Sequence, residues 1–203
     1  MATETATEDD VRPARRRPES LAKLKRAARK LFVERGYHAT RPQDIAREAG
    51  VGHGTFYLHY PDKRACFLAF VDEARTELDE TVRARVGQDK TLEGLIGNTL
   101  RAIYEYSQAH PGVLGAAMTD EAVISAEGAQ ATPLLERWGR DWAAIVRDAA
   151  NQGRAADFYD ADIVGQAIVG AIHQAASEGQ RSGKNSEDMV RNLSRFLVRA
   201  LKP

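Results

Sequence analysis

The chain has 203 residues, of which 43% are hydrophobic, 29% charged and 7% aromatic, and its 29 basic residues balance 29 acidic ones. This is the composition of an ordinary soluble protein with a large core, and the absence of any run of about 18 apolar residues argues against a membrane span. The single cysteine, Cys66, excludes an internal disulfide framework, and the acidic N-terminus lacks the apolar part of a secretory signal, so we expect a reducing, cytoplasmic location.

Charge is distributed unevenly along the chain. Residues 1–10 carry four acids and no base, residues 11–64 carry fourteen Lys or Arg against five Asp or Glu, and residues 65–203 carry fifteen bases against twenty acids. A basic segment on a neutral chain indicates that one region binds a polyanion. The competing interpretation is a basic helix face that is merely solvated. Residues 1–17, rich in Thr, Glu, Asp and Arg, are predicted to be disordered.

The first predicted helix covers residues 19–35. Its apolar positions recur at helical spacing: Leu21, Leu24, Ala28, Leu31 and Phe32. Gly36 is expected to end this helix, and Tyr37 to fold back onto the core.

Residues 40–63 predict two short helices joined by a tight turn. Thr40 and Gln43 form a T-x-x-Q capping-box pattern, and Pro42 suits the first helical turn, where its missing N–H costs nothing. Gly50 is expected to end the first short helix in a left-handed conformation. The second runs from about residue 52 to 59 and directs Phe56 inward. Its polar and aromatic residues face outward, as in a helix-turn-helix that enters the major groove of DNA: His53, Gly54, Thr55, Tyr57 and His59.

The stretch from about residue 20 to 70 resembles the tetracycline-repressor (TetR) family of bacterial transcription regulators. Many positions agree in order and spacing: Leu31, Phe32, Arg35, Gly36, Tyr37, Thr40, Asp44, Ile45, Ala46, Ala49, Gly50, Val51, Gly54, Thr55, Phe56, Tyr57, His59, Tyr60, Asp62 and Lys63. Two positions depart from the family pattern, because Gly52 stands where Ser is common and His53 where Lys or Arg is frequent.

The resemblance implies a role for each residue of the helix-turn-helix. His53 and Thr55 would read base edges, and the Gly54 backbone would allow close approach. The expected phosphate contacts are Arg41, Tyr57, His59 and Lys63. Arg15, Arg16 and Arg17 would serve as a DNA-touching arm, as in some family members, or would only aid solubility.

Further helices are predicted at residues 62–86, 91–109, 111–118, 133–152, 161–178 and 186–201, with no strand pattern. The predicted fold is all-α, with about nine helices. We expect a basic-ended arm at 1–17, a three-helix DNA-binding domain at 18–64, and a helical bundle for ligand binding and dimerisation at 65–203. The resemblance implies that the helix at 62–86 joins the two domains and sets the spacing of two DNA-reading heads.

A ligand site is predicted in the bundle from its aromatic and polar side chains. The candidates are Tyr104, His110, Met118, Trp138 and Trp142, which suit an apolar or aromatic molecule with one polar anchor. Trp138 and Trp142 are four residues apart and so share a helix face, where core packing is an equally open interpretation. For His110 the alternative is a hydrogen-bonded histidine at a helix end, and for Cys66 the two interpretations are a redox sensor and a small buried residue.

A dimer interface is predicted at the C-terminus. The helix at 161–178 is apolar around most of its circumference, so it needs cover on two faces, and the helix at 186–201 repeats the pattern. Two such helices from each chain would form an isologous four-helix bundle. The candidate interface residues are Ile168, Ala171, Ala175, Leu193, Phe196 and Leu197.

Nothing in the sequence predicts catalysis, a metal or a cofactor. The five histidines are scattered without ligand spacing, and no CxxC, GxSxG or GxGxxG pattern occurs. The sequence therefore predicts a transcription regulator that binds a near-palindromic double-stranded operator as a homodimer and is released by a small molecule. The resemblance implies a repressor, since repression is the usual mode in the family. Two alternatives stay open: the same fold switched by a protein partner, and an enzyme built on a helical bundle.

Overall fold

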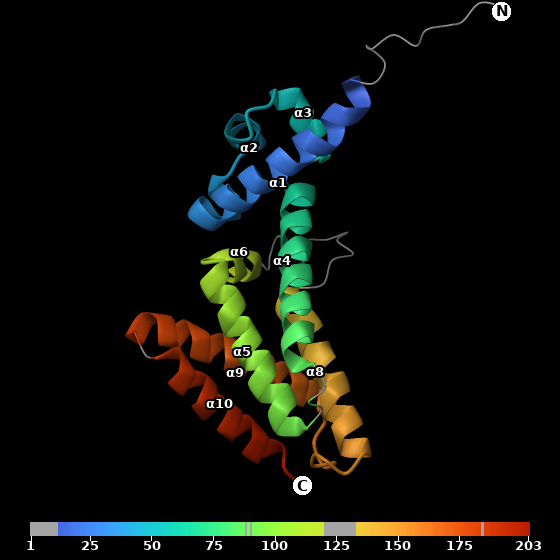
Figure 1. Cartoon of the computed structure of the whole chain (residues 1–203), viewed down its shortest axis with the longest axis vertical. Coiled ribbons are helices and arrows are strands. Elements are labelled where there is room, and N and C mark those ends of the chain that lie inside the picture. The colour runs from blue at the N-terminus through green and yellow to red at the C-terminus, as the bar shows by residue number, and fades with distance from the viewer. Residues whose placement is uncertain (1–11, 88, 90, 120–132, 184) are drawn as a thin grey trace, which may run out of the picture. The chain divides into compact units, whose positions relative to one another are not determined.

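The computed structural model describes residues 12–87, 89, 91–119, 133–183 and 185–203. Within these ranges all regular structure is helical, which confirms the all-α prediction (Figure 1). Nine helices lie in the described part of the chain: α1 (Arg12–Ala39), α2 (Pro42–Glu48), α3 (His53–Tyr57), α4 (Lys63–Val86), α5 (Leu92–Ala109), α6 (Val113–Thr119), α8 (Leu134–Asn151), α9 (Ala161–Ser182) and α10 (Ser186–Leu201). None of these helices is long and apolar enough to cross a membrane.

The described residues fall into two compact units. The first contains the residues up to Asp72 together with the segment that starts at Gly115, and the second contains Glu73–Leu114 and the described residues from 133 onward. Helix α4 continues from the first unit into the second. The predicted domain boundary at residue 64 therefore lies in the first turn of α4, whereas the compact unit extends two turns further.

The first unit is built around α1. Its core contains Leu24, Ala27, Ala28, Leu31, Phe32, Ile45, Ala46, Phe56, Tyr60, Cys66, Phe67, Phe70 and Val71. Three aromatic rings join α1 to α4, because Phe32 lies 5.1 Å from Phe67 and 5.6 Å from Phe70 between ring centroids. Aromatic contacts of this kind contribute roughly 0.5–1.5 kcal/mol each beyond the area they bury. The unit thus holds two very short helices, α2 and α3, on a rigid base.

Helix α1 differs at both ends from the prediction. It begins at Arg12, so the arginines at 12, 15, 16 and 17 that were assigned to a disordered arm belong to a helix, while residues 1–11 lie outside the described residues. Near its other end Gly36 has φ 75° and ψ 174°, which breaks the helical path at the predicted position. The turn of helix after it brings Tyr37 back, 5.0 Å from the ring of Phe67.

The predicted capping box at Thr40 is wrong. Arg41 is the N-cap of α2, and no side chain makes a capping hydrogen bond there. Thr40 is instead fully buried, and its hydroxyl donates at 2.8 Å to the carbonyl of Gly36, with the Leu31 carbonyl 3.3 Å away. The reason is that the kink at Gly36 leaves carbonyls of α1 without helical partners, and a buried carbonyl needs a donor. Thr40 therefore secures the end of α1 rather than the start of α2.

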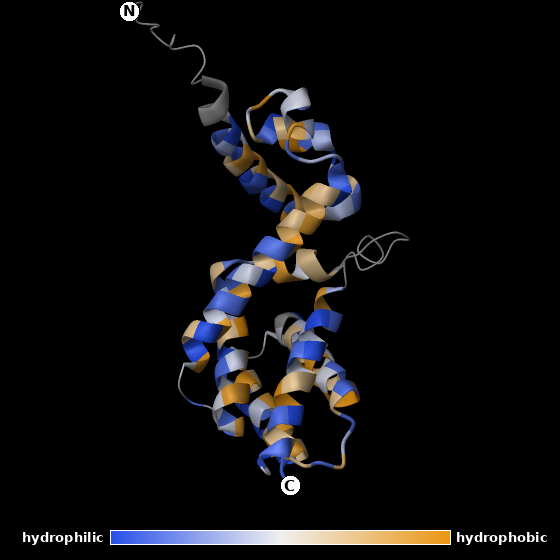
Figure 2. Ribbon diagram, turned by 90° about the vertical axis from the view of Figure 1, so that its right-hand side faces the viewer, coloured by the Kyte–Doolittle hydropathy of each residue, from blue (hydrophilic) through white to orange (hydrophobic). Residues whose placement is uncertain are grey.

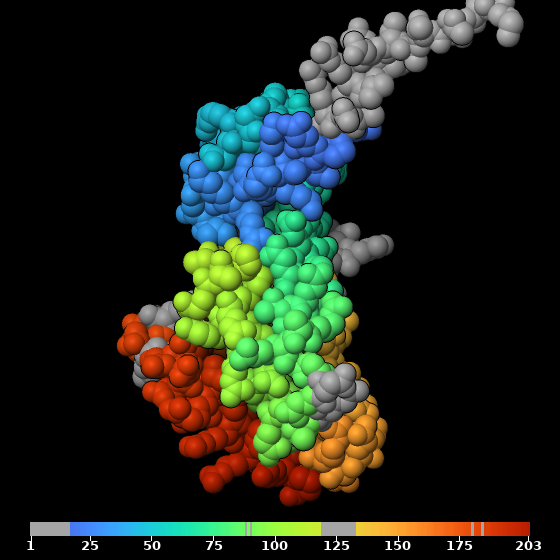
Figure 3. Space-filling model, viewed as in Figure 1, coloured from blue at the N-terminus to red at the C-terminus, as the bar shows by residue number. Residues whose placement is uncertain are grey.

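The second unit is a helical bundle with one apolar cluster. Its buried members are Leu92, Ile96, Leu100, Trp142, Val146, Ile168, Val169, Val190, Leu197, Val198 and Leu201. Helices α5 and α10 pack side by side (yellow-green and red in Figure 3), and α8 and α9 form the most extensive helix pair. Figure 2 shows hydrophobic and hydrophilic positions alternating along these helices, as amphipathic bundle helices require.

One close crossing in this bundle depends on glycine. A Cβ placed on Gly165 of α9 would lie 2.2 Å from the carbonyl oxygen of Gly139 and 2.6 Å from the backbone nitrogen of Ala143, both on α8. Neither backbone atom can move without shifting its helix, so α8 and α9 approach this closely only because residue 165 has no side chain. The small residues of α9 therefore serve a contact inside the chain as well as any contact with a partner.

Side-chain caps fix the starts of three bundle helices. Asp160 caps α9 by accepting hydrogen bonds from the backbone N–H groups of Asp162 and Ile163. Thr91 caps α5, and Asn185 caps α10. Each such cap contributes about 1 kcal/mol to helix stability. Because Asp, Thr and Asn are preferred at this position, the three helix starts could be placed from the sequence to within one or two residues.

Cys66 lies in the core of the first unit and is 1% exposed. Burial raises the pKa of its thiol to about 12, from an ordinary value of 9.0. Between pH 9 and 12 the folded protein therefore holds the thiol protonated, whereas the unfolded chain ionises it. The contribution of this thiol to the free energy of unfolding is complete below pH 9 and is lost as the pH rises toward 12. A thiolate is the reactive form, so these properties favour the buried-residue interpretation over a redox sensor.

This gives a testable expectation. Relative to Cys66→Ala, the wild-type free energy of unfolding should fall by about 1.4 kcal/mol per pH unit between pH 9 and the folded-state pKa. Urea unfolding of both proteins at pH 8, 9, 10 and 11 measures the difference, in which other alkaline groups cancel. Equal pH slopes for the two proteins would contradict a buried, protonated thiol.

Candidate functional site

The turn between α2 and α3 has the geometry that the sequence predicts. Ala49 ends α2, Gly50 takes a left-handed conformation with φ 65°, and the Val51 N–H donates to the Ala46 carbonyl at 3.0 Å. Gly52 is the N-cap of α3, and its carbonyl accepts from the Thr55 N–H at 2.8 Å. Ile45 and Phe56, both 0% exposed, fix the inner faces of the two helices. The outer face of α3 is thereby directed to solvent at a defined angle.

The residues predicted to contact DNA occupy that outer face. His53 and Gly54 are exposed, Thr55 is half-buried, and Tyr57 is 50% exposed. The rings of His53 and Tyr57 lie edge to face with centroids 5.3 Å apart. One turn of helix therefore presents an imidazole, a hydroxyl and a phenol with a glycine between them, which together offer hydrogen bonds and a place for close backbone approach. Leu58, 64% exposed, continues this surface.

His59 and Lys63 are held in place by other parts of the first unit. Nε2 of His59 lies 2.8 Å from the Ser20 hydroxyl, which itself donates to the Arg17 carbonyl at 3.0 Å. Because a hydroxyl has one hydrogen, His59 donates from Nε2 when Ser20 donates to Arg17. Lys63 donates from Nζ to the Tyr37 carbonyl at 3.0 Å, and the same Nζ lies 4.0 Å from the centre of the Tyr37 ring. Both cationic or potentially cationic groups are thus positioned before any ligand arrives.

Ion pairs position part of the surrounding basic surface. Lys30 of α1 donates to Glu48 of α2 at 2.6 Å; this bond raises the pKa of Lys30 and lowers that of Glu48. Arg47 pairs with Asp44 within α2. Arg41, at the N-cap of α2, is exposed. The pairs contribute little to stability because they are exposed, but the Lys30–Glu48 pair joins α1 to α2.

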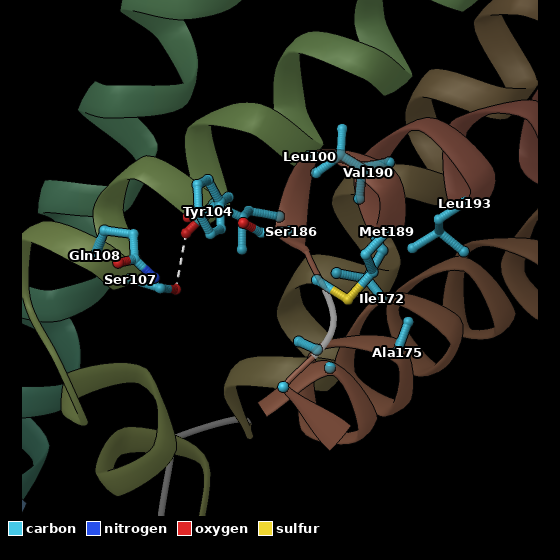
Figure 4. Close-up of a pocket in the computed structure, with 14 residues that line it drawn as sticks. Leu100, Tyr104, Ser107, Gln108, Ile172, Ala175, Ser186, Met189, Val190 and Leu193 are labelled. Carbon is cyan, nitrogen blue, oxygen red and sulfur yellow. Dashed lines mark hydrogen bonds between the residues drawn. The ribbon is translucent and has the colours of Figure 1, made fainter. Parts of the chain in front are cut away.

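The second unit contains a pocket of about 360 Å³ between α5, α9 and α10 (Figure 4). It is lined by Leu100, Ile103, Tyr104, Ser107, Gln108, Ile172, Ala175, Ala176, Gly179, Gly183, Ser186, Met189, Val190 and Leu193. Its volume lies at the lower end of the range that ligand sites in proteins occupy, roughly 300–1,000 Å³. The helices that form it also contribute to the apolar cluster, so its walls are continuous with the core.

Of the five residues predicted to bind a ligand, Tyr104 lines this pocket. Trp142 belongs to the apolar cluster at 6% exposure, and Trp138 packs against that cluster. His110 ends α5, its ring 4.6 Å from that of Tyr106, whose hydroxyl donates to Glu77 at 2.7 Å. Met118 is half-buried on α6. These four residues are not among those that line the pocket.

The residues predicted to form a dimer interface divide into two groups. Ile168 and Leu197, 2% and 4% exposed, lie in the core of the single chain. Ala175, Leu193 and Phe196 line a surface groove between α9 and α10, where Phe196 is 62% exposed. Ala171 is half-buried on α9. The groove is completed by Glu178, Gly179, Asn185, Asp188, Met189 and Asn192.

Comparison with known proteins agrees with the geometry of the first unit. Residues 24–70 match the family described as "Bacterial regulatory proteins, tetR family". The matched segment contains α2, α3, the turn between them and the aromatic contacts that support them. It covers the residues that the sequence predicts to contact DNA, apart from the arginines at the start of α1.

Individual relatives extend this match. The chain is 34% identical over 77 residues to the HTH-type transcriptional repressor KstR2 of Rhodococcus jostii, which covers 36% of this chain and 38% of the relative. It is 37% identical over 67 residues to the HTH-type transcriptional activator FasR of Mycolicibacterium smegmatis, or 33% of this chain and 31% of the relative. In both cases less than two thirds of the relative's length is spanned.

A solved structure of the fatty acid degradation regulator FadR from Bacillus halodurans aligns with 89% of this chain and 95% of its own, with a TM-score of 0.70. At 17% identity this likeness concerns the fold, which it extends to the helical bundle.

Three groups of residues in these sites were missed by the sequence analysis. Ser20, which positions His59, lies 39 residues away in sequence, so no local pattern links the two. Ser107 and Gln108 follow Tyr104 at helical spacing and could have been grouped with it. Met189 and Ser186 belong to α10, and their place in the pocket depends on the angle at which α10 crosses α5 and α9, which a periodic pattern does not specify.

Proposed function

The chain belongs to the TetR family of bacterial transcriptional regulators and carries the DNA-binding domain of that family, and we propose that it is a repressor that binds a near-palindromic operator as a homodimer until a small molecule releases it. The observation that carries the proposal is the outer face of α3, where His53, Gly54, Thr55 and Tyr57 are presented on a buried base. One curated relative is a repressor and another an activator. Repression is proposed because it is the usual mode in the family.

In the proposed complex α3 lies in the major groove. His53 and Thr55 contact base edges, and Gly54 lets the DNA approach the helix backbone. Tyr57, His59, Lys63 and Arg41 contact phosphates, which fix the orientation of the helix without reading sequence. His59 and Lys63 are already held by Ser20 and Tyr37, so little side-chain freedom is lost when DNA binds.

The groove between α9 and α10 supports the dimer proposal. Phe196 is a large apolar side chain that is 62% exposed there, beside the half-buried Leu193 and Ala175. An isologous contact across a two-fold axis would bring the grooves of two chains together and cover both Phe196 rings. Two reading heads would then lie about one turn of B-DNA apart, which is the reason to expect a near-palindrome.

The pocket supports the proposal of a small-molecule effector. Four residues, Ala175, Gly179, Met189 and Leu193, line both the pocket and the groove proposed for dimer contact. A molecule bound in the pocket would therefore contact residues that also face the partner chain in the proposed dimer. To release DNA almost fully, an effector must bind the dimer conformer with wrongly spaced DNA-reading heads about 10⁴-fold more tightly than the DNA-binding conformer.

The two alternatives have less support. A switch by a protein partner would be favoured if the bundle had no cavity, whereas it has a pocket of about 360 Å³. An enzyme would be favoured by acidic and basic side chains clustered in a pocket. The residues that line this pocket are uncharged, and the matched proteins are transcription regulators.

Two substitutions test how α3 meets DNA. Tyr57→Phe removes one hydroxyl and should weaken binding to operator and scrambled duplex by the same factor, about tenfold, because a phosphate contact carries no base information. His53→Ala should mainly reduce the preference for operator, by about 1–3 kcal/mol at one or two base pairs per half-site.

Fluorescence anisotropy at fixed salt with both duplexes gives these four affinities. Tyr159→Phe is the matched control, since Tyr159 is 42% exposed in the second unit. If the Tyr57→Phe protein, like the Tyr159→Phe control, binds both duplexes as tightly as wild type, the proposed docking of α3 is incorrect.

A further inference from the structure

The pocket between α5, α9 and α10 has two chemically different walls. Tyr104, Ser107 and Gln108 of α5 form one side, and Ile172, Met189 and Leu193 of α9 and α10 form the other (Figure 4). Three hydrogen-bonding side chains thus lie on the α5 wall, while the facing wall is mainly apolar and adds the hydroxyl of Ser186 from α10. A molecule that satisfies both walls has an apolar body and a polar group toward one side.

None of the fourteen described residues that line this pocket is Asp, Glu, Lys, Arg or His. Glu178 and Asp188, which lie nearby in sequence, line the outer groove instead. A charged group among these side chains would gain no opposite charge to offset the hydration that it lost, which is unfavourable. The lining therefore selects against free carboxylates and amines and admits neutral molecules.

The hydrogen-bonding groups on the α5 wall also limit the ligand. The Ser107 hydroxyl donates to the Ile103 carbonyl at 2.8 Å, so its oxygen is left as an acceptor. Tyr104 can donate its phenolic hydrogen, and Gln108 can donate or accept. A neutral carbonyl, ester or hydroxyl group meets this set. At about 30 Å³ for each water-sized group, a pocket of about 360 Å³ holds a molecule of about a dozen non-hydrogen atoms.

We propose that this pocket binds a small neutral molecule with an apolar body, whose carbonyl, ester or hydroxyl group is held by Tyr104 and Gln108. The effector role of that molecule rests on the function proposed above, whereas its binding does not. The proposal narrows the effector from any apolar or aromatic compound to uncharged ones, and it replaces the predicted set of lining residues with the α5, α9 and α10 set.

Matched neutral and charged probes test the proposal on the full chain. Methyl hexanoate and methyl benzoate should bind with Kd values below about 1 mM, as expected for ligands of this size. Hexanoate and benzoate, of nearly the same shape, should bind at least tenfold more weakly. Isothermal titration calorimetry at pH 7.5 measures all four. Equal or tighter binding of the carboxylates would overturn the proposal, and so would failure of both esters to bind at 1 mM.

Pocket variants assign the site. Tyr104→Phe should weaken ester binding about tenfold, and Ala176→Trp, which fills the pocket, should abolish it. Ala144→Trp is the matched control, because Ala144 is exposed on α8 and does not line the pocket. Circular dichroism checks folding, and Tyr104→Phe remains decisive if Ala176→Trp fails to fold. Ester binding that neither pocket variant changes would place the ligand elsewhere and reject the assignment.

Operator release by the esters is measured in parallel by anisotropy. Esters that bind as stated without releasing operator leave the pocket assignment standing and contradict the effector part of the proposed function. If the protein binds no operator at all, the DNA-binding part of the proposed function is contradicted, and the calorimetric test of the pocket is unaffected.

Discussion

Phe196→Glu is expected to leave the protein monomeric at micromolar concentration and to weaken operator binding by at least about 100-fold. The ring lies in the groove between α9 and α10 and is 62% exposed in the single chain, so the fold of one chain does not depend on its burial. In the proposed dimer the groove becomes the centre of the interface, where an unpaired carboxylate costs several kcal/mol. Operator affinity falls because a lone head makes half of the contacts.

Phe158→Glu is the matched control for this change. Phe158 is 72% exposed, precedes α9 and does not line the groove, so the same substitution there should alter neither association nor DNA binding. Sedimentation velocity at protein concentrations of about 1–10 micromolar measures association, and fluorescence anisotropy with operator measures DNA binding. A Phe196→Glu protein that stays dimeric, or a wild type that is monomeric and still binds a palindrome tightly, would contradict the proposed interface.

The same change at Ile168, another of the residues predicted to lie at the dimer interface, would not be informative. Ile168 is 2% exposed within one chain and belongs to the apolar cluster, as does Leu197. A charge at either position would disrupt the fold of a single chain whatever its association. The exposed Phe196 separates the two effects.

Gly54→Ala is expected to weaken operator binding at least about tenfold (~1.4 kcal/mol) while slightly stabilising the protein. Gly54 is exposed in α3, and a Cβ placed there meets no atom of the chain within 4 Å. Replacing an exposed helical glycine with alanine favours folding by roughly 0.5–1 kcal/mol. The added methyl group therefore has nothing to clash with except DNA, and lost affinity would report close approach of DNA to this point of the helix.

The control for this second variant is Gly115→Ala. Gly115 is also exposed in a helix, α6, and a Cβ there likewise meets nothing within 4 Å. Thermal unfolding and anisotropy titrations at fixed salt compare both variants with wild type. Unchanged operator affinity for Gly54→Ala would mean that DNA does not come close to α3 at Gly54, and that the close-approach role assigned to this glycine is wrong.

The helix-turn-helix could be predicted closely because its determinants are local. Gly50 must take a positive φ, Pro42 fits the first turn of a helix, and Phe56 follows at the spacing that brings it inward. Each of these depends on neighbours within a few residues. Thr40 shows the limit of such patterns, because a threonine before a helix is normally a cap, whereas here the carbonyls freed by the kink at Gly36 compete for its hydroxyl.

The ligand pocket and the dimer face could not be predicted as well, because both depend on how helices cross. The apolar pattern of α9 indicates two covered faces but does not say which residues another helix of the same chain covers. Gly165 shows the difficulty: a small residue on α9 could admit a helix of a partner chain, but it admits α8 of its own chain. In the same way Trp142 was placed in a possible ligand site and lies in the core instead.

The most direct test of the central claim is selection of DNA by the wild-type protein from a library of random duplexes, followed by sequencing. Two copies of α3 related by a two-fold axis should enrich an inverted repeat whose half-sites lie about 10 base pairs apart, or slightly more. Recovery of no enriched motif, or of a single asymmetric half-site, would contradict the proposal that the chain reads a near-palindromic operator as a dimer.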